Sequence, residues 1–113
     1  MKAVLAVIPV ADFDPACDWY ESFFGRPADT RPMDCLAEWH LSDLGIVQVF
    51  HAPERAGRTA VNFTVDDLDA ARTELTAKGI RTADPQVVAG GRQRLTTTTD
   101  KDGNSLGLLQ TVD

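Results

Sequence analysis

The sequence predicts a single α+β domain, residues 1–113, in which one structural unit occurs twice. A chain of 113 residues buries roughly 65% of its unfolded surface on folding, which supports a core without disulfides. Segments 4–27 and 59–80 share the order apolar strand, aspartate-rich turn, helix and glycine. Each segment is followed by two strand-like runs joined by a turn rich in Asp and Gly. The predicted modules are therefore 1–53 and 58–113.

In the first module, an apolar strand beginning at Val4 leads into a helix. Asp14 is the predicted N-cap and Pro15 the first helical residue, where its missing N–H is harmless. Gly25 ends the helix, and Pro27 prevents its continuation. The spacing of four apolar residues predicts one buried helix face, made of Ala16, Trp19, Tyr20 and Phe23. Further strands are predicted at 29–32, 37–41 and 45–50.

The second module repeats this order with a shorter apolar stripe. Asp66 or Asp67 caps the predicted helix, and Gly79 follows its end. The stripe consists of Leu68, Ala71 and Leu75. Further strands are predicted at 86–89, 92–99 and 105–111.

Alternation along the strands indicates which side chains face the helices. The expected helix-facing sets are Val4, Ala6, Ile8 and Val10 in the first module, and Val61, Phe63 and Val65 in the second. The opposite faces carry Leu5, Val7 and Pro9, and Ala60, Asn62 and Thr64. In strand 45–50, Val47 and Val49 take one face, and Ile46, Gln48 and Phe50 the other. Helices on one face and a mixed polar and aromatic lining on the other predict a cupped cavity that suits a small molecule.

Three segments carry a resemblance to a known family: VIPVADFDPACDWYESFFGRP, VNFTVDDLDAARTELTAKGI and DKDGNSLGLLQ. In this order they resemble the vicinal oxygen chelate superfamily, which includes glyoxalases, bleomycin resistance proteins and dioxygenases. The resemblance implies the glyoxalase/bleomycin-resistance-like fold, in which two βαβββ modules form a cupped mixed sheet. It also implies a homodimer. Because the family contains both metalloenzymes and metal-free binding proteins, the fold alone leaves the function open.

The metal enzymes of this family hold their ion through one residue in the first strand and one in the last strand of each module. The resemblance places these four positions at Leu5, Gln48, Ala60 and Gly107. Three of these residues have no ligand atom in the side chain, whereas a catalytic divalent ion needs about three protein ligands. We therefore expect no metal and no other cofactor.

Five residues are candidates for the cavity lining. Gln48 and Asn62 are the polar groups expected inside, where they contact either a ligand or a neighbouring strand. Trp39 and Phe50 are either core aromatics or aromatic walls of the cavity. His40 follows Trp39 in one strand, so only one of the two faces the cavity, and the pattern leaves open which.

Arginines in the strand 92–99 complete the predicted site. Alternation places Arg92 and Arg94 on one face with Thr96 and Thr98. This pattern indicates either the solvated face of an edge strand or a cationic wall for a carboxylate ligand. Arg94 is therefore a candidate ligand-binding residue, and no catalytic residue is identified.

Composition and charge restrict the partners. The formal net charge of −6 argues against nucleic acid, since phosphate binding needs a basic face. No apolar run approaches the ~20 residues that span a bilayer, so we expect no membrane association. The opening apolar run stops at Asp12 and is interpreted as a strand rather than a leader. Cys17 and Cys35 are too few for a disulfide scaffold, and Cys17 is expected to be a buried thiol. A cytoplasmic protein is predicted.

The leading hypothesis is a metal-free protein that binds or sequesters a drug or metabolite, as bleomycin-resistance-type members do. Residues 1–56 carry 9 acidic and 4 basic side chains, a net charge of −5, which favours a cationic ligand, while the aromatic residues favour an aromatic one. The alternative is a lyase, isomerase or dioxygenase of the same superfamily, with an unrecognised metal site or acid–base catalysis by His40 or a carboxylate such as Glu38. A third possibility is a pure interaction module.

Overall fold

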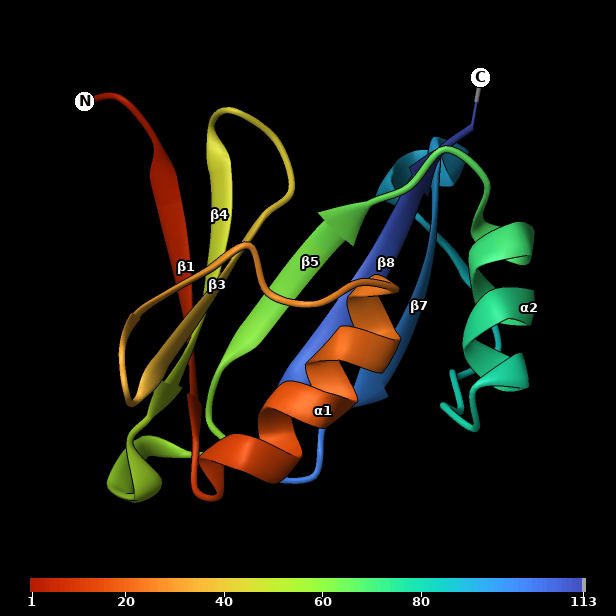
Figure 1. Ribbon diagram of the computed structural model, residues 1–113. Helices are drawn as coiled ribbons and strands as arrows, with labels where there is room; N and C mark the ends of the chain where they lie inside the picture. Colours follow the sequence, from red (N-terminus) through yellow and green to blue (C-terminus); the bar gives the residue numbers. More distant parts are fainter. Residues whose placement is uncertain (113) are drawn as a thin grey trace. The chain divides into compact units, whose positions relative to one another are not determined.

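The computed structural model describes residues 1–112, which form two compact units. Unit 1 comprises Met1–Thr59 together with Asp100–Asn104, and unit 2 comprises Ala60–Thr99 together with the residues from Ser105 onward. Each unit contains one α-helix and one four-stranded mixed sheet (Figure 1). This is the predicted α+β architecture. The turn 100–104 belongs structurally to unit 1, although it connects two strands of unit 2.

Unit 1 follows the predicted order of elements. These are β1 (Val4–Val10), α1 (Phe13–Phe24), β2 (Thr30–Met33), β3 (Leu36–His40) and β4 (Gly45–His51). The strand order is β1-β4-β3-β2, with β1 parallel to β4 and the other pairs antiparallel. The first strand of the chain is therefore an edge strand of its sheet.

Helix α1 begins two residues earlier than the sequence predicts. Its N-cap is Asp12, which has extended backbone angles, so the prediction of Asp14 as the cap is wrong. The reason is that the first four N–H groups of a helix have no partner within the helix. Pro15 is therefore tolerated at the third helical position as well as at the first. Gly25 ends α1 as predicted, with a left-handed φ of 80° and its N–H bonded to the Glu21 carbonyl.

One face of the first sheet is packed against the rings of α1. Ile8 and Val10 in β1 and Val49 in β4 are fully buried there. The predicted helix-facing set is thus buried in the second half of β1, whereas Val4 at the start of the strand is 73% exposed. Trp39 is 1% exposed, and its ring centroid lies 5.3 Å from that of Phe24 in α1. The indole Nε1 donates a hydrogen bond of 2.9 Å to the Arg26 carbonyl. Trp39 is therefore a core residue whose one polar atom is satisfied.

Cys17 is a buried free thiol, as predicted. It belongs to the buried face of α1 together with Ala16, Tyr20 and Phe23. Trp19, which the spacing predicts on that face, is only half-buried, and its ring stacks on that of Phe23 with the centroids 5.4 Å apart. Desolvation raises the pKa of the Cys17 thiol above its ordinary value. The thiol is thus kept neutral and acts as a small apolar side chain.

Unit 2 repeats the arrangement of unit 1. Its elements are β5 (Ala60–Thr64), α2 (Leu68–Ala77), β6 (Gln86–Val88), β7 (Gln93–Thr99) and β8 (Ser105–Thr111). The strand order is β5-β8-β7-β6. Asp67 caps α2 by accepting a hydrogen bond of 3.0 Å from the Ala70 N–H, which is one of the two predicted caps. Because β7 lies between β8 and β6, the expectation of an edge strand at 92–99 is wrong.

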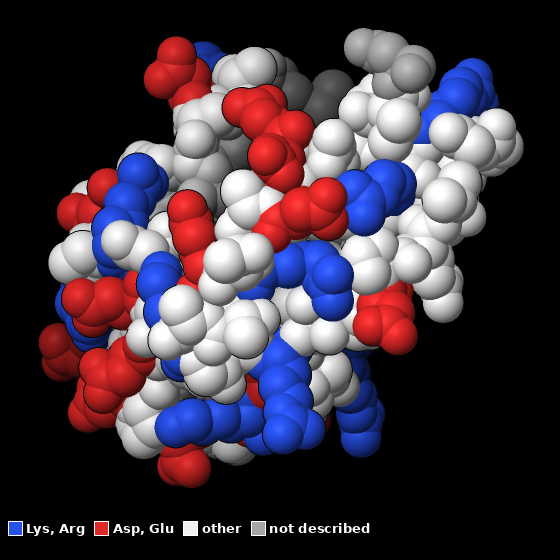
Figure 2. Space-filling view, turned by 90° about the vertical axis from the view of Figure 1, so that its right-hand side faces the viewer, with Lys and Arg blue, Asp and Glu red and all other residues white. Residues whose placement is uncertain are grey.

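On the side that Figure 2 presents, acidic and basic side chains are interspersed. Within residues 1–112, neither α-helix is long and apolar enough to cross a membrane.

Candidate functional site

The face of the first sheet that lies away from α1 carries side chains in rows that cross the strands. The strand register places a middle row side by side, one residue from each strand: Val7, Gln48, Glu38 and Thr30. On one side of it lies a row of Leu5, Ile46 and His40, and on the other a row of Pro9, Phe50 and Leu36. These ten residues are called the open face below; Pro9 and Leu36 are its two buried members. Its middle row is mostly polar, and the rows beside it are mostly apolar.

Glu38 is the centre of the polar row. Its Oε2 accepts a hydrogen bond of 2.6 Å from Gln48 Nε2, and its Oε1 accepts one of 3.1 Å from Thr30 Oγ1. The Nε2 atom of His40 lies 3.4 Å from the same Oε1. The hydrogen bond from Gln48 is the main reason why the pKa of Glu38 is lower than its ordinary value, and Thr30 and His40 act in the same direction. Glu38 is therefore an anionic group near neutral pH.

The open face brings together three of the predicted site residues. Gln48 lies in the middle row, and Phe50 lies half-buried beside it. Of the pair left open by the sequence, His40 is on the open face and Trp39 is on the opposite face, within the core. Trp39 therefore does not reach the open face. The sequence pattern does not identify Thr30, because only the pairing of β2 with β3 brings it opposite Glu38.

Two predicted site residues lie in unit 2. Asn62 is on the side of β5 opposite Phe63, and its register partner in β8 is Gly107. Arg94 is on the α2 side of its sheet, where its two terminal nitrogens lie 3.1 and 3.3 Å from the carboxylate of Asp69 in α2. This ion pair lowers the pKa of Asp69 and raises that of Arg94. Arg94 is thus bonded to a helix and does not present a cationic wall.

The four positions implied for a metal do not fit a metal ion in this chain. Leu5 is an exposed apolar side chain, and Ala60 offers no ligand atom. Gly107 lies against the side chain of Asn62, whose Oδ1 occupies the space that a β-carbon at position 107 would take. Within residues 1–112, no three His, Cys, Asp or Glu side chains come together in a way that could hold a metal ion. Gln48 alone remains, and its amide is bonded to Glu38.

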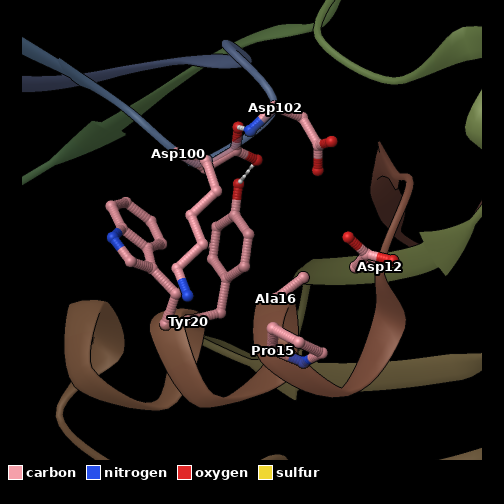
Figure 3. Close-up of a pocket in the computed structure, with 8 residues that line it drawn as sticks. Asp12, Pro15, Ala16, Tyr20, Asp100 and Asp102 are labelled. Carbon is pink, nitrogen blue, oxygen red and sulfur yellow. Dashed lines mark hydrogen bonds between the residues drawn. The ribbon is translucent and has the colours of Figure 1, made fainter.

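A hollow in unit 1, with a volume of about 100 Å³, lies beside α1 and the turn 100–104 (Figure 3). The Tyr20 hydroxyl donates a hydrogen bond of 2.6 Å to Asp100 Oδ2, and burial raises the pKa of Tyr20 far above its ordinary value. Asp100 also accepts from Asn104 Nδ2, and from the N–H groups of Asp102 and Asn104. These four donors occupy both oxygens of the carboxylate. Asp100 therefore fixes the turn, and we place the candidate site on the open face.

Replacing Tyr20 by phenylalanine tests this assignment. The variant removes the hydroxyl that donates to the buried Asp100 oxygen, so we expect the free energy of unfolding to fall by about 1–2 kcal/mol. Urea denaturation followed by circular dichroism measures the change. Thr97→Val, which removes an exposed hydroxyl, is the control and should leave the midpoint nearly unchanged. Equal midpoints for Tyr20→Phe and the wild type would contradict the role given to this bond.

Comparison with solved structures finds close matches to the whole chain. A glyoxalase/bleomycin resistance protein from Catenulispora acidiphila DSM 44928 is 28% identical, with a TM-score of 0.90, over 99% of this chain and 100% of that one. A bleomycin-binding protein in complex with bleomycin is 22% identical, with a TM-score of 0.80, over 99% and 100% of the two chains. A lactoylglutathione lyase from Agrobacterium tumefaciens is 18% identical, with a TM-score of 0.79, over 95% and 91%. No protein-family model and no curated protein matches the sequence.

Proposed function

Because the chain has the glyoxalase/bleomycin-resistance fold, and its structural neighbours are consistent with the vicinal oxygen chelate superfamily, we propose that it binds and sequesters a small organic molecule, a drug or a metabolite, on the open face. The observation that carries the proposal is the row of Gln48, Glu38 and Thr30 between two apolar rows. A few fixed polar groups surrounded by apolar contact area are typical of small-molecule sites.

Each part of the open face has a role in this proposal. Leu5 and Val7 are 46% and 39% exposed, so a ligand that covers them removes apolar surface from water. The Phe50 ring, in the row on the other side of Val7 from Leu5, is half-buried and offers an aromatic contact. Gln48 and Glu38 provide the hydrogen-bonding groups that orient the ligand. A bleomycin-binding protein whose structure contains bleomycin is similar in fold to this chain. Bleomycin is therefore the first probe to use.

Titration of the purified protein with metal-free bleomycin and a panel of aromatic and amino-sugar compounds tests the proposal. We expect at least one compound to bind saturably, as measured by titration calorimetry. Val7→Gln should weaken that binding about fivefold, because burying a smaller apolar area loses about 1 kcal/mol. Val87→Gln is the matched control, since Val87 is also an exposed strand valine but lies in unit 2. Absence of saturable binding across the panel would refute sequestration.

A second candidate function rests on one observation, the contact of 3.4 Å between His40 Nε2 and Glu38 Oε1. An imidazole beside a carboxylate can act as a general base, which would suit a lyase or isomerase that works without a metal. The two functions differ in what happens to the ligand. Sequestration predicts that the bound compound is recovered unchanged after prolonged incubation, whereas an enzyme predicts turnover that His40→Ala abolishes.

The proposal includes a cytoplasmic homodimer. Its support is that β1 is an edge strand and exposes Val4, because an exposed apolar edge is normally covered by another chain or element. Free Cys17 and Cys35 suit a reducing compartment. Light scattering should give twice the 12.3 kDa mass of the chain, and a monomer at micromolar concentration would contradict the dimer.

A further inference from the structure

Building on the proposed function, we infer that the ligand carries an organic cation, a protonated amine or an amidinium-type group, and that Glu38 is the residue that selects it. The inference names the chemical class of the ligand and one carboxylate oxygen, Oε2, as its anchor. It rests on the hydrogen bonds, the neighbouring charges and the apolar surroundings of Glu38.

The negative charge of Glu38 has little compensation. Thr30 and Gln48, which bond to the carboxylate from β2 and β4, are neutral donors. Within residues 1–112, the ion-pair partner of Glu38 is His40, at the long distance of 3.4 Å and with a side chain that is 43% exposed. The nearby guanidinium of Arg26 is directed elsewhere, to Asp29 and to the His40 carbonyl.

Asp29, the other acidic residue near His40, is not available as an anchor. Its Oδ2 accepts hydrogen bonds from the His40 N–H at 2.7 Å and from Arg26 at 3.0 Å. These bonds lower the pKa of Asp29, with the backbone donor of His40 as the main cause. The Asp29 carboxylate therefore already has a cationic partner, which Arg26 provides, whereas Glu38 lacks a permanent one.

The hydrogen-bond geometry leaves an acceptor position at Glu38. A carboxylate offers about four lone-pair positions, and Oε2 accepts one recorded hydrogen bond, from Gln48. Because the carboxylate only accepts, Gln48 presents its NH₂ group to it, which leaves the amide oxygen of Gln48 as a further acceptor. An ammonium or amidinium group has several N–H donors, which match two neighbouring acceptors. A charge-assisted hydrogen bond of this kind is about twice as strong as a neutral one.

The surroundings favour an organic cation over a metal ion. The Glu38 side chain is only 14% exposed, and the exposed apolar side chains of Leu5 and Val7 lie on the same face. A partly buried carboxylate beside exposed apolar surface favours a cation that carries its own apolar body. The charge then meets the carboxylate and the apolar body covers the apolar side chains. A hydrated ion would gain only one carboxylate, one neutral amide and one hydroxyl, too few ligands for a divalent site.

Benzamidine and its neutral isostere benzamide provide the test. Both are aromatic and planar, and they differ mainly in charge. We expect the ¹⁵N-labelled wild-type protein to bind benzamidine at least tenfold more tightly than benzamide, with amide shifts around residues 30, 38 and 48. Glu38→Gln, which preserves shape and removes the charge, should reduce this ratio below twofold. Glu21→Gln, an exposed glutamate on α1, makes the same change in net charge and should leave the ratio unaltered.

Salt provides a measurement that needs no variant. Raising NaCl from 50 to 500 mM should weaken benzamidine binding severalfold and leave benzamide binding nearly unchanged, because ions screen only the charged pair. Equal affinities of the two compounds for the wild type, an unchanged ratio in Glu38→Gln, or failure of benzamidine to bind while another panel compound does, would each overturn the inference and leave sequestration standing. Failure of the entire panel to bind would instead overturn the proposed function.

Discussion

Replacing Asn104 by alanine is expected to lower the free energy of unfolding by about 3–4 kcal/mol, because one buried side chain makes four hydrogen bonds. Asn104 is 0% exposed. Its Oδ1 accepts hydrogen bonds from the N–H groups of Gly57 and Thr59, at 3.0 and 3.1 Å. Its Nδ2 donates to the Pro9 carbonyl and to Asp100 Oδ2, both at 2.8 Å. In the alanine variant, all four partners lose their hydrogen bond to this side chain while they stay buried or half-buried.

Urea denaturation of the Asn104→Ala variant measures this loss directly. Asn62→Ala is the matched control, because Asn62 is an exposed asparagine on a strand, and surface substitutions usually change stability by no more than about 0.5 kcal/mol. Comparing the two variants separates the loss of the buried hydrogen bonds from the general effect of replacing an asparagine by alanine. If the free energy of unfolding of Asn104→Ala lies within about 1 kcal/mol of the wild-type value, the turn 100–104 does not hold the end of β1 and the segment 57–59 as described.

Gly57→Ala is expected to destabilise the protein by about 2–4 kcal/mol, because the new β-carbon has no space. The backbone at Gly57 has a φ of 85°, and an added β-carbon would overlap the carbonyl oxygen of Asp102. That oxygen belongs to the turn fixed by Asp100 and Asn104, so it cannot move away easily. The segment 57–59 would have to move away and lose the hydrogen bond from the Gly57 N–H to Asn104.

Gly79→Ala separates the steric overlap from the backbone strain. Gly79 has nearly the same φ, 81°, but an added β-carbon there meets nothing within 4 Å. The free energy of unfolding of the Gly79 variant should therefore fall only by what a left-handed backbone costs alanine, about 1–2 kcal/mol. The difference between the two variants, measured by thermal or urea unfolding, isolates the overlap with Asp102. Equal losses of stability in both variants would show that the close approach of residue 57 to the Asp102 carbonyl does not affect stability.

Much of the fold could be predicted from local patterns. Alternation in β1 separated Ile8 and Val10 from Leu5 and Val7 correctly, because the sheet buries one face under a helix and leaves the other more exposed. Gly25 and Asp67 mark helix ends by their own backbone or side-chain chemistry. Such signals depend only on neighbours along the chain, and this is why they can be read without the structure.

The candidate site depended on contacts that the sequence does not show. The strand with Trp39 and His40 has a large or polar residue on both faces, so alternation could not decide between them. The decision comes from the α1 rings and from the Arg26 carbonyl that receives the indole N–H. In the same way, Arg94 is 25 residues from its partner Asp69, and Tyr20 is 80 residues from Asp100. Only the folded chain brings these pairs together.

The central claim is that the open face of unit 1 is the ligand site, and a ¹⁵N NMR titration with metal-free bleomycin tests it most directly. We predict saturable shifts of backbone amides in 5–7, 36–40 and 46–50, with the amide of Thr30 also perturbed. The amides of α2 and of the turn 100–104 should stay in place. Saturable shifts confined to α2, or to the hollow beside Tyr20 and Asp100, would contradict the claim.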